Sequence, residues 1–468
     1  MNKHALISLS CAVLLAAAGC GPDATTQAAR PGGSAPKPFT LDTALGSNGF
    51  AALPLSPSTH DRFMAVTTAP DGKVYAAGYT TLDGDQAMTV ARIDATGKLD
   101  PTFGANGVAT ANVAVGGKTG ELARAVAVQS DGKILVAGPA ERDPKGSGDA
   151  ARDTDVAVVR FDAAGKLDPT YGTGGIAKVD FGPGRVTTGT TFVGDTSWGL
   201  GVLPGNKAVV FGSMLAEAPR TDPDFVLIAL TSAGASDAAF GRDGRIVVDL
   251  GSTPDSPRNV AVQPDGKVLA TGYTNVGGVV QPVLIRTTAQ GQLDTTFGKE
   301  GVATAKVLPG VAESYTVALQ GQNYVLAGYG RGEDANEKVD LIVYRFLANG
   351  THDTTFGANG VTRVDIAKED DRARNLAVLP DGRLLAVGSG KRDPVNVNGM
   401  VTMLGKDGAV DTTVGQGGNI MSDLGGPNDS WYGVAVSPDK KWLYLVGFKG
   451  VATDGAGNDD AVFARAAL

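Results

Sequence analysis

From residue 41 onward the chain consists of short runs in which apolar residues alternate with small or polar ones, separated by glycine-rich turns. One set of four runs covers residues 107–113, 123–129, 134–138 and 156–161. A period of two is typical of β-strands, and no segment after Thr40 shows the period of an amphipathic helix. The pair Asp131-Gly132 between the second and third runs is typical of a tight hairpin turn. Each set therefore predicts one four-stranded antiparallel sheet.

A phrase close to Leu-Asp-Pro-Thr-Phe-Gly-x-x-Gly, here called the anchor, recurs seven times, and Leu99–Gly107 is a full copy. Its aspartate is retained in every copy: Asp42, Asp100, Asp168, Asp237, Asp294, Asp353 and Asp411. Consecutive copies lie between 57 residues (Asp237 to Asp294) and 69 residues (Asp168 to Asp237) apart. Such a period indicates one structural unit copied along the chain, with neighbouring units burying each other's faces.

Seven units of four strands predict an all-β, seven-bladed β-propeller over residues 41–468. The chain opens with an anchor and a single strand at 41–55, and its last run, 461–468, has no anchor behind it. We therefore expect the strand within 49–55 to pair with 461–468 and complete the last blade. This 3+1 closure leaves no free sheet edge. An array of β-sandwiches is the alternative, but it would not need such a permuted ending.

Composition agrees with a turn-rich β protein, because 66 of the 468 residues are glycine, about twice the usual share. The chain has 41 basic and 49 acidic residues, a net charge of −8. A mildly acidic protein without a basic run is a poor candidate for binding nucleic acid, so we expect no such partner.

The first residues resemble a bacterial lipoprotein signal: Lys3, an apolar stretch and then Ala17-Ala18-Gly19-Cys20. This resemblance implies a signal peptide at 1–19, a lipidated Cys20 and anchoring in the cell envelope. Residues 20–40 are rich in Pro, Gly, Ala, Ser and Thr, and predict a flexible tether. Gly21 differs from the Asp that resembles an inner-membrane retention signal, which favours the outer membrane. An ordinary secretory signal is the alternative.

The repeat also resembles the delta-60 repeat family, whose consensus runs close to A-R-A-V-A-V-Q-x-D-G-K-I-L-V-A-G after the anchor. Ala123–Gly138 matches this consensus almost letter for letter, and Arg258–Gly272 nearly so. The resemblance covers about residues 41–468. It implies an exported bacterial protein with a propeller-like fold, and it implies no activity.

Two repeated positions predict structural contacts at the anchors. An arginine lies eight residues before the anchor aspartate in five units: Arg92, Arg160, Arg286, Arg345 and, across the chain ends, Arg465. Ala229 and Met403 replace it in the other two. We expect each arginine to pair with its aspartate. The anchor aromatics are expected to pack between blades: Phe103, Tyr171, Phe240, Phe297 and Phe356.

A third repeated position predicts a ligand site. An acid precedes each innermost strand except in the fifth unit, where Val311 takes its place with Glu313 nearby; the acids are Asp61, Glu121, Asp195, Asp255, Asp371 and Asp429. Three residues later stand Met64, Arg124, Trp198, Arg258, Ser314, Arg374 and Tyr432. With Trp431, the arginines and aromatics among them are predicted to gather at one mouth of the central channel within a rim of acids. Alternatively, acid and arginine simply pair to hold the crossover between blades.

Long insertions at 139–154 and 181–197 are expected on the same face as this mouth, and function concentrates where loops vary on a rigid scaffold. Arginine forks bind carboxylates or phosphates, and exposed aromatics stack on sugars or apolar groups. The sequence thus predicts a membrane-anchored binding or scaffolding protein with a glycan or a peptide or protein ligand.

Catalytic material is sparse. After the predicted signal only His60 and His352 remain, which do not make a typical zinc site, and Cys20 is the sole cysteine. Paired carboxylates leave open a polysaccharide hydrolase or lyase, and a structural surface protein is a further alternative. We expect no cofactor, apart from calcium at the acidic loops 454–460 or 83–85.

Overall fold

The computed structural model describes residues 39–46, 48–56, 60–94, 96–114, 121–142, 153–182, 184–188, 191–251, 255–391, 395–450 and 459–468. They belong to one compact unit, Phe39–Leu468. The predicted signal peptide, Cys20 and nearly all of the predicted tether lie outside the described residues, as does the acidic loop at 454–458. None of the described helical segments has the length and apolar character needed to cross a membrane.

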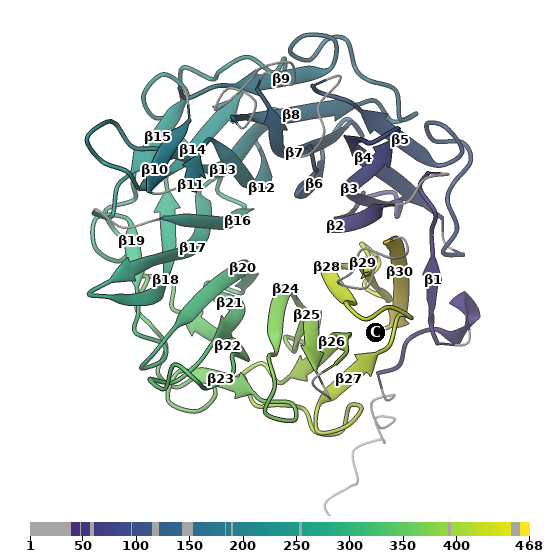
Figure 1. The fold of residues 1–468 in the computed structure, drawn as a ribbon, viewed down its shortest axis with the longest axis vertical. Coiled ribbons are helices and arrows are strands. Elements are labelled where there is room, and N and C mark those ends of the chain that lie inside the picture. The colour runs from purple at the N-terminus through teal and green to yellow at the C-terminus, as the bar shows by residue number, and fades with distance from the viewer. Residues whose placement is uncertain are drawn as a thin grey trace, which may run out of the picture. The chain divides into compact units, whose positions relative to one another are not determined.

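Seven four-stranded antiparallel sheets form a ring, as predicted, with the first strand of each set nearest the centre (Figure 1). From the inside outward, blade 1 contains β2 (Asp61–Thr68), β3 (Val74–Leu82), β4 (Asp85–Ile93) and β5 (Val108–Ala111). Blade 2 contains β6 (Ala125–Val128), β7 (Ile134–Glu141), β8 (Thr154–Phe161) and β9 (Ile176–Val179). Blades 3 and 4 contain β12 (Thr196–Leu203), β13 (Lys207–Leu215), β14 (Pro223–Leu230) and β15 (Arg245–Val248), then β16 (Ser256–Val262), β17 (Val268–Val276), β18 (Val279–Thr287) and β19 (Val302–Thr304).

The remaining blades repeat this order. Blades 5 and 6 contain β20 (Ala312–Gln320), β21 (Asn323–Gly330), β22 (Asp340–Phe346) and β23 (Val361–Val364), then β24 (Arg372–Val378), β25 (Leu384–Lys391), β26 (Val397–Leu404) and β27 (Asn419–Ser422). Blade 7 contains β28 (Ser430–Val436), β29 (Trp442–Lys449), β30 (Asp460–Ala467) and β1 (Phe50–Ala52). A small hairpin, β10 (Arg185–Thr188) and β11 (Thr191–Val193), and the 3-10 turn Thr43–Leu45 complete the described elements.

The ring closes through the predicted clasp. The N-terminal strand β1 pairs antiparallel with β30, with Phe50 opposite Ala464 and Ala52 opposite Val462. The strand is shorter than the predicted range, since regular pairing covers only Phe50–Ala52. Across the same seam the Arg465 guanidinium lies 2.6 Å from the Asp42 carboxylate. The two ends of the chain therefore build one blade together.

The hydrophobic core lies between neighbouring blades. Tyr75 and Ala77 of blade 1, for example, share a buried cluster with Ile134 and Val136 of blade 2. The anchor aromatics are buried as predicted: Phe103, Tyr171, Phe240, Phe297 and Phe356. A glycine of the following blade lies against the ring in each case, such as Gly165 against Phe103. Each blade thus buries apolar surface of the next, and no blade has a complete core of its own.

The predicted arginine–aspartate pairs are present at the anchors. The distances between guanidinium nitrogen and carboxylate oxygen are 2.8 Å for Arg92–Asp100, 3.0 Å for Arg160–Asp168, 2.9 Å for Arg286–Asp294 and 2.8 Å for Arg345–Asp353. Where the arginine is replaced, another basic side chain reaches the aspartate: Lys207 lies 2.7 Å from Asp237. The aspartate also accepts hydrogen bonds within its own turn, as Asp100 does from Thr102. This double use explains why the aspartate persists in every repeat.

Candidate ligand site in the central channel

A β-bulge interrupts the innermost strand of every blade at the same place. In blade 1, Phe63 pairs with Gly78 and Ala65 with Ala77, so Met64 is an extra residue with no partner. In blade 2, both Arg124 and Ala125 face Ala137. A bulge redirects a side chain that regular pairing would place between blades. The bulge residues are Met64, Arg124, Trp198, Arg258, Tyr315, Arg374 and Tyr432.

A glycine on the second strand makes room for each bulge. A side-chain carbon at Gly78 would lie 1.8 Å from the carbonyl oxygen of Arg62, and one at Gly388 would lie 1.9 Å from that of Arg372. The same conflict with a backbone carbonyl arises at Gly138, Gly212, Gly272, Gly328 and Gly447. This close approach is the physical reason that the run after each hairpin contains a glycine.

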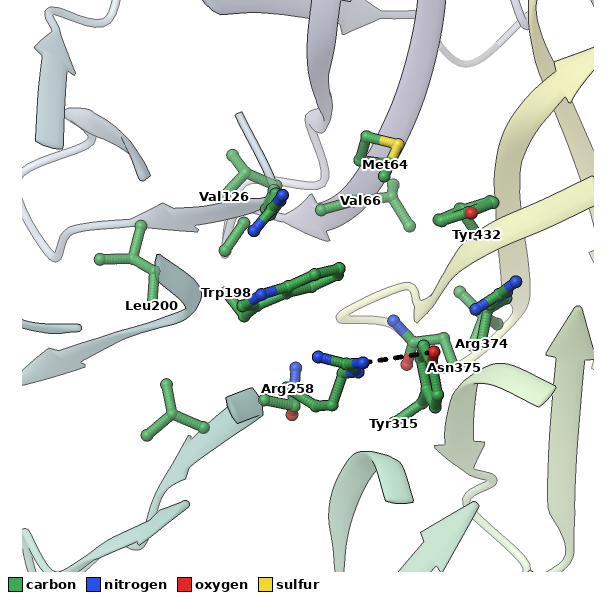
Figure 2. Close-up of a pocket in the computed structure, with 16 residues that line it drawn as sticks. Met64, Val66, Val126, Trp198, Leu200, Arg258, Tyr315, Arg374, Asn375 and Tyr432 are labelled. Carbon is green, nitrogen blue, oxygen red and sulfur yellow. Dashed lines mark hydrogen bonds between the residues drawn. The ribbon is translucent and has the colours of Figure 1, made fainter. Parts of the chain in front are cut away.

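The bulge side chains line one cavity of about 290 Å³ at the centre of the ring (Figure 2). Taken in blade order from Arg124 to Tyr432, arginine and aromatic residues alternate without exception, and Met64 occupies the seventh place. The cavity also contains an aliphatic layer two residues further along the strands: Val66, Val126, Leu200, Val260 and Val434.

The alternating side chains stack on one another. The guanidinium carbon of Arg124 lies 3.8 Å from the centre of the Trp198 ring, and that of Arg258 lies 4.5 Å from it. Tyr315 has Arg258 at 4.7 Å and Arg374 at 4.8 Å. These are cation–π distances, so Trp198 and Tyr315 each separate two cations and hold both in place.

None of the three channel arginines forms an ion pair with a carboxylate among the described residues. Burial raises the pKa of the nearby Glu313, although the charge of Arg258 acts to lower it. Arg124 donates to the Thr196 hydroxyl at 2.8 Å, and Arg258 to the Tyr273 hydroxyl at 2.6 Å. The Nε atoms of Arg258 and Arg374 are buried and have no hydrogen-bond acceptor. Burial, together with the charge of Arg258, lowers the pKa of Arg124 to about 10, so it remains protonated at neutral pH. The site holds three positive charges and unused donors.

The six predicted acids do not form a rim around this cavity, which corrects the sequence-based expectation. All are buried, and none lines the cavity. Their carboxylates hold the crossover that leads into each innermost strand: Asp371 accepts from the Ile366 amide at 2.6 Å and Asp195 from that of Phe181 at 2.7 Å. Equivalent bonds at the crossovers involve Asp61, Glu121, Asp255 and Asp429. The alternative of acid–arginine pairing is also wrong for the described residues, since the arginines point into the channel.

The prediction for Trp431 is wrong as well. Its side chain is fully buried, pairs in register opposite Gly447 and lies against Gly399. The extra residue of that strand is Tyr432, which does reach the cavity as predicted. A one-residue step along a strand reverses the direction of a side chain, and here only the position of the bulge decides which aromatic faces the channel.

In the fifth blade, alignment of the seven repeats did not identify Tyr315 as a channel residue. It placed Ser314 at the channel, but Ser314 is buried opposite Gly328, and Tyr315 is the bulge residue. The hairpin of this blade is shorter, with Gln320 paired to Asn323, so counting from Val311 gives the wrong register. Counting back from Gly328 through the shorter hairpin would have found Tyr315.

Burial acts to raise the pKa of Tyr315, but the charges of Arg258 and Arg374 outweigh this effect and lower that pKa.

The crossover acids give the fold a specific pH dependence. Burial raises the pKa to about 7 in Glu121, Asp195 and Asp255, to about 8 in Asp371 and to about 6 in Asp429. A carboxyl whose pKa is higher in the folded chain favours folding while it is protonated, and this contribution is lost as the pH rises through the folded pKa. The anchor aspartates have the opposite pH dependence. Hydrogen bonds from Thr102 lower the pKa of Asp100 to about 2, so its contribution to folding stability is lost in acid.

We predict that the free energy of unfolding, and with it the melting temperature, falls between about pH 5 and about pH 8.5. In the Asp371→Asn variant this fall in unfolding free energy should be smaller by on the order of 1 kcal/mol or more. The amide keeps an acceptor for Ile366 but does not ionise. Thermal melts over the pH series test this, with the exposed Asp381→Asn as a control that keeps the native slope. An unchanged slope in the Asp371 variant would contradict the prediction.

Two groups of three carboxyls among the described residues have metal-ligand spacing: Asp155, Asp180 and Asp195, and Asp340, Asp365 and Asp371. Each already has a basic partner, since Lys178 lies 3.3 Å from Asp155 and Arg363 is hydrogen bonded to Asp340. Of the loops predicted to bind calcium, Asp83 lies in an exposed turn and 454–458 lies outside the described residues. Calcium binding there stays a prediction.

A family model described as a domain of unknown function (DUF5122) beta-propeller matches residues 69–103, 129–171 and 263–297. Each segment runs from the hairpin region through the second and third strands to the anchor, in blades 1, 2 and 4. No curated protein matches the sequence.

Solved structures with a similar arrangement include a protein of unknown function from Dyadobacter fermentans, with 11% identity, a TM-score of 0.47, and coverage of 90% of this chain and 98% of that one. The polysaccharide lyase Uly1 shows 12% identity, a TM-score of 0.46 and coverage of 88% and 90%. An ulvan lyase of family PL25 shows 11% identity, a TM-score of 0.43 and coverage of 87% and 94%. With its seven blades and the three segments matched by the family model, the chain is a β-propeller repeat protein.

Proposed function

We propose that this protein is an exported, lipid-anchored binding protein that captures an acidic ligand, a glycan or a peptide segment, in the central cavity. One observation carries the proposal: three arginines from blades 2, 4 and 6 line a single cavity, and among the described residues none of them forms an ion pair with a carboxylate. Unpaired guanidinium groups bind carboxylate, sulfate or phosphate oxygens through two parallel hydrogen bonds.

The cavity lining favours binding over carboxylate-dependent catalysis. Hydrolysis of a glycosidic bond by two carboxyl groups requires both to flank the bond. The residues that line the cavity include no aspartate or glutamate, and the nearby acids accept hydrogen bonds from the crossovers instead. The proposed role is therefore recognition, with the blades as a rigid support for the seven bulge residues.

Replacing Arg124, Arg258 and Arg374 together by glutamine is expected to weaken capture of acidic ligands by about 100-fold or more, because charge-assisted hydrogen bonds contribute about 1.5–3 kcal/mol each. An array of acidic and neutral glycans and peptides, probed with the native and triple-variant chains, measures the loss. Arg242→Gln, an exposed arginine outside the cavity, is the control. Equal binding of native and triple-variant chains, with unchanged melting temperatures, would place the site elsewhere.

Anchoring rests on the sequence alone, through the signal at 1–19 and the cysteine at its end. Cys20→Ser is expected to prevent incorporation of a fatty-acid analogue and to release the protein from the membrane fraction. The native chain, labelled and fractionated in parallel, is the reference. A variant that is processed normally and still stays in the membrane fraction would contradict lipid anchoring.

A further inference from the structure

We infer that the part of the ligand that enters the ring is a compact polyanion, with two or three carboxylate or phosphate groups on a body about the size of one sugar. This inference rests on the proposed function and names the ligand class for the same site. It excludes two other ligand types for the ring: a neutral sugar stacked on an aromatic face, and a long segment with widely spaced single charges.

The charges of the lining set the charge of the ligand. Arg124, Arg258 and Arg374 stand on every second blade, so they approach the same space from three sides. Burial and the neighbouring Arg258 lower the pKa of Arg124, which means that these two cations repel each other across a poorly solvated space. A ligand with a single negative charge neutralises only one of these arginines. A ligand with two charges relieves the repulsion between Arg124 and Arg258, and a third charge on the ligand pairs with Arg374.

The donors that remain free point to oxyanions. Arg258 already uses its two terminal nitrogens on Pro257, Tyr273 and Tyr315, the last at 3.5 Å in the contact drawn in Figure 2. Its Nε and that of Arg374 are buried without an acceptor. A buried donor without a partner costs free energy unless a ligand or water supplies an acceptor. Carboxylate and phosphate oxygens supply such acceptors and compensate the charge as well.

The rings of Trp198 and Tyr315 are not free to stack on a sugar. Trp198 carries the guanidinium groups of Arg124 and Arg258, at 3.8 and 4.5 Å, and these come from the two blades on either side of it. Tyr315 carries Arg258 and Arg374 in the same manner. The rings therefore act as spacers that fix the arginines before the ligand arrives, which lowers the entropy lost on binding.

The cavity volume limits the body of the ligand. A volume of about 290 Å³ lies at the lower end of the roughly 300–1,000 Å³ that ligand pockets in proteins span. A pocket of this size favours a body of about one sugar unit over several linked units. The aliphatic layer formed by Val66, Val126 and Val260, among others, favours a carbon skeleton on that side. The charged groups would then lie against the arginine layer.

Calorimetric titration of the full-length chain with acetate, succinate and tricarballylate, at constant ionic strength, tests the inference. These acids offer one, two and three carboxylates on similar aliphatic bodies, and inorganic phosphate and pyrophosphate form a parallel phosphate series. Affinity is expected to rise about tenfold with each added charge. In the Arg124→Gln, Arg258→Gln, Arg374→Gln triple variant these steps should disappear. Trp198→Leu, which keeps all three charges but removes a spacer, should weaken tricarballylate more than acetate.

The outcomes separate this inference from the proposed function. Tricarballylate and pyrophosphate binding no tighter than acetate and phosphate, or charge steps that persist in the triple variant, would overturn the inference. A long acidic glycan or peptide that binds in an arginine-dependent manner, while no small polyanion does, would overturn it and leave the proposed function standing. Failure of both long and small acids to bind would overturn the two together.

Discussion

Removing residues 41–55 is expected to destabilise the whole ring, with a fall in melting temperature of about 10 °C or more. Leu45, Leu53 and Leu55 are buried in the seam between blades 7 and 1. Withdrawing each from that seam costs about 1.5–3 kcal/mol. The deletion also leaves Arg465 without Asp42 and exposes the backbone of β30 as a free edge. Because each blade supports the next, the loss should spread beyond blade 7.

Differential scanning calorimetry and size-exclusion chromatography measure this effect. A deletion of 21–38, which leaves the clasp intact, is the control and should melt like the full chain. The clasp deletion should show one broad transition at lower temperature and a tendency to associate through the exposed edge. If it melts at the same temperature as the control, β1 does not close the ring.

Gly388→Ala should have the second large effect, a loss of about 3 kcal/mol or more in unfolding free energy. The added methyl carbon would lie 1.9 Å from the carbonyl oxygen of Arg372, so the backbone of β24 must move. That movement would also displace the bulge at Arg374. We therefore expect a second consequence, weaker capture of acidic ligands, in the fraction of the protein that remains folded.

Gly132→Ala separates steric conflict from the backbone preference of glycine. Gly132 has a φ of +82°, and a side-chain carbon there would meet no atom within 4 Å. Alanine at that turn should cost only about 1–2 kcal/mol, through the left-handed conformation alone. Chemical denaturation of both variants provides the comparison. A Gly388 variant as stable as the Gly132 variant would mean that the bulge tolerates movement.

Sequence reasoning determined the architecture because the unit repeats. The anchor aspartates marked seven blades, the order of runs at the two ends predicted the clasp, and the arginine eight residues before an anchor predicted a pair such as Arg92–Asp100. These features depend on local spacing within one unit, and seven copies of the same spacing reinforce one another. Five of the predicted channel side chains also reach the cavity: Arg124, Trp198, Arg258, Arg374 and Tyr432.

Tertiary structure alone decided which way the remaining side chains point. Trp431 and Tyr432 are neighbours with similar chemistry, and Ser314 and Tyr315 differ by one position, yet only Tyr432 and Tyr315 reach the cavity. The bulge that selects them is a property of the pairing between two strands, including the length of the hairpin that joins them. The acids likewise lie at the crossovers, because a buried carboxyl group needs the hydrogen bonds that the backbone amides of those loops provide. Identity and spacing predict which residues come near the channel, and strand register decides which of them face it.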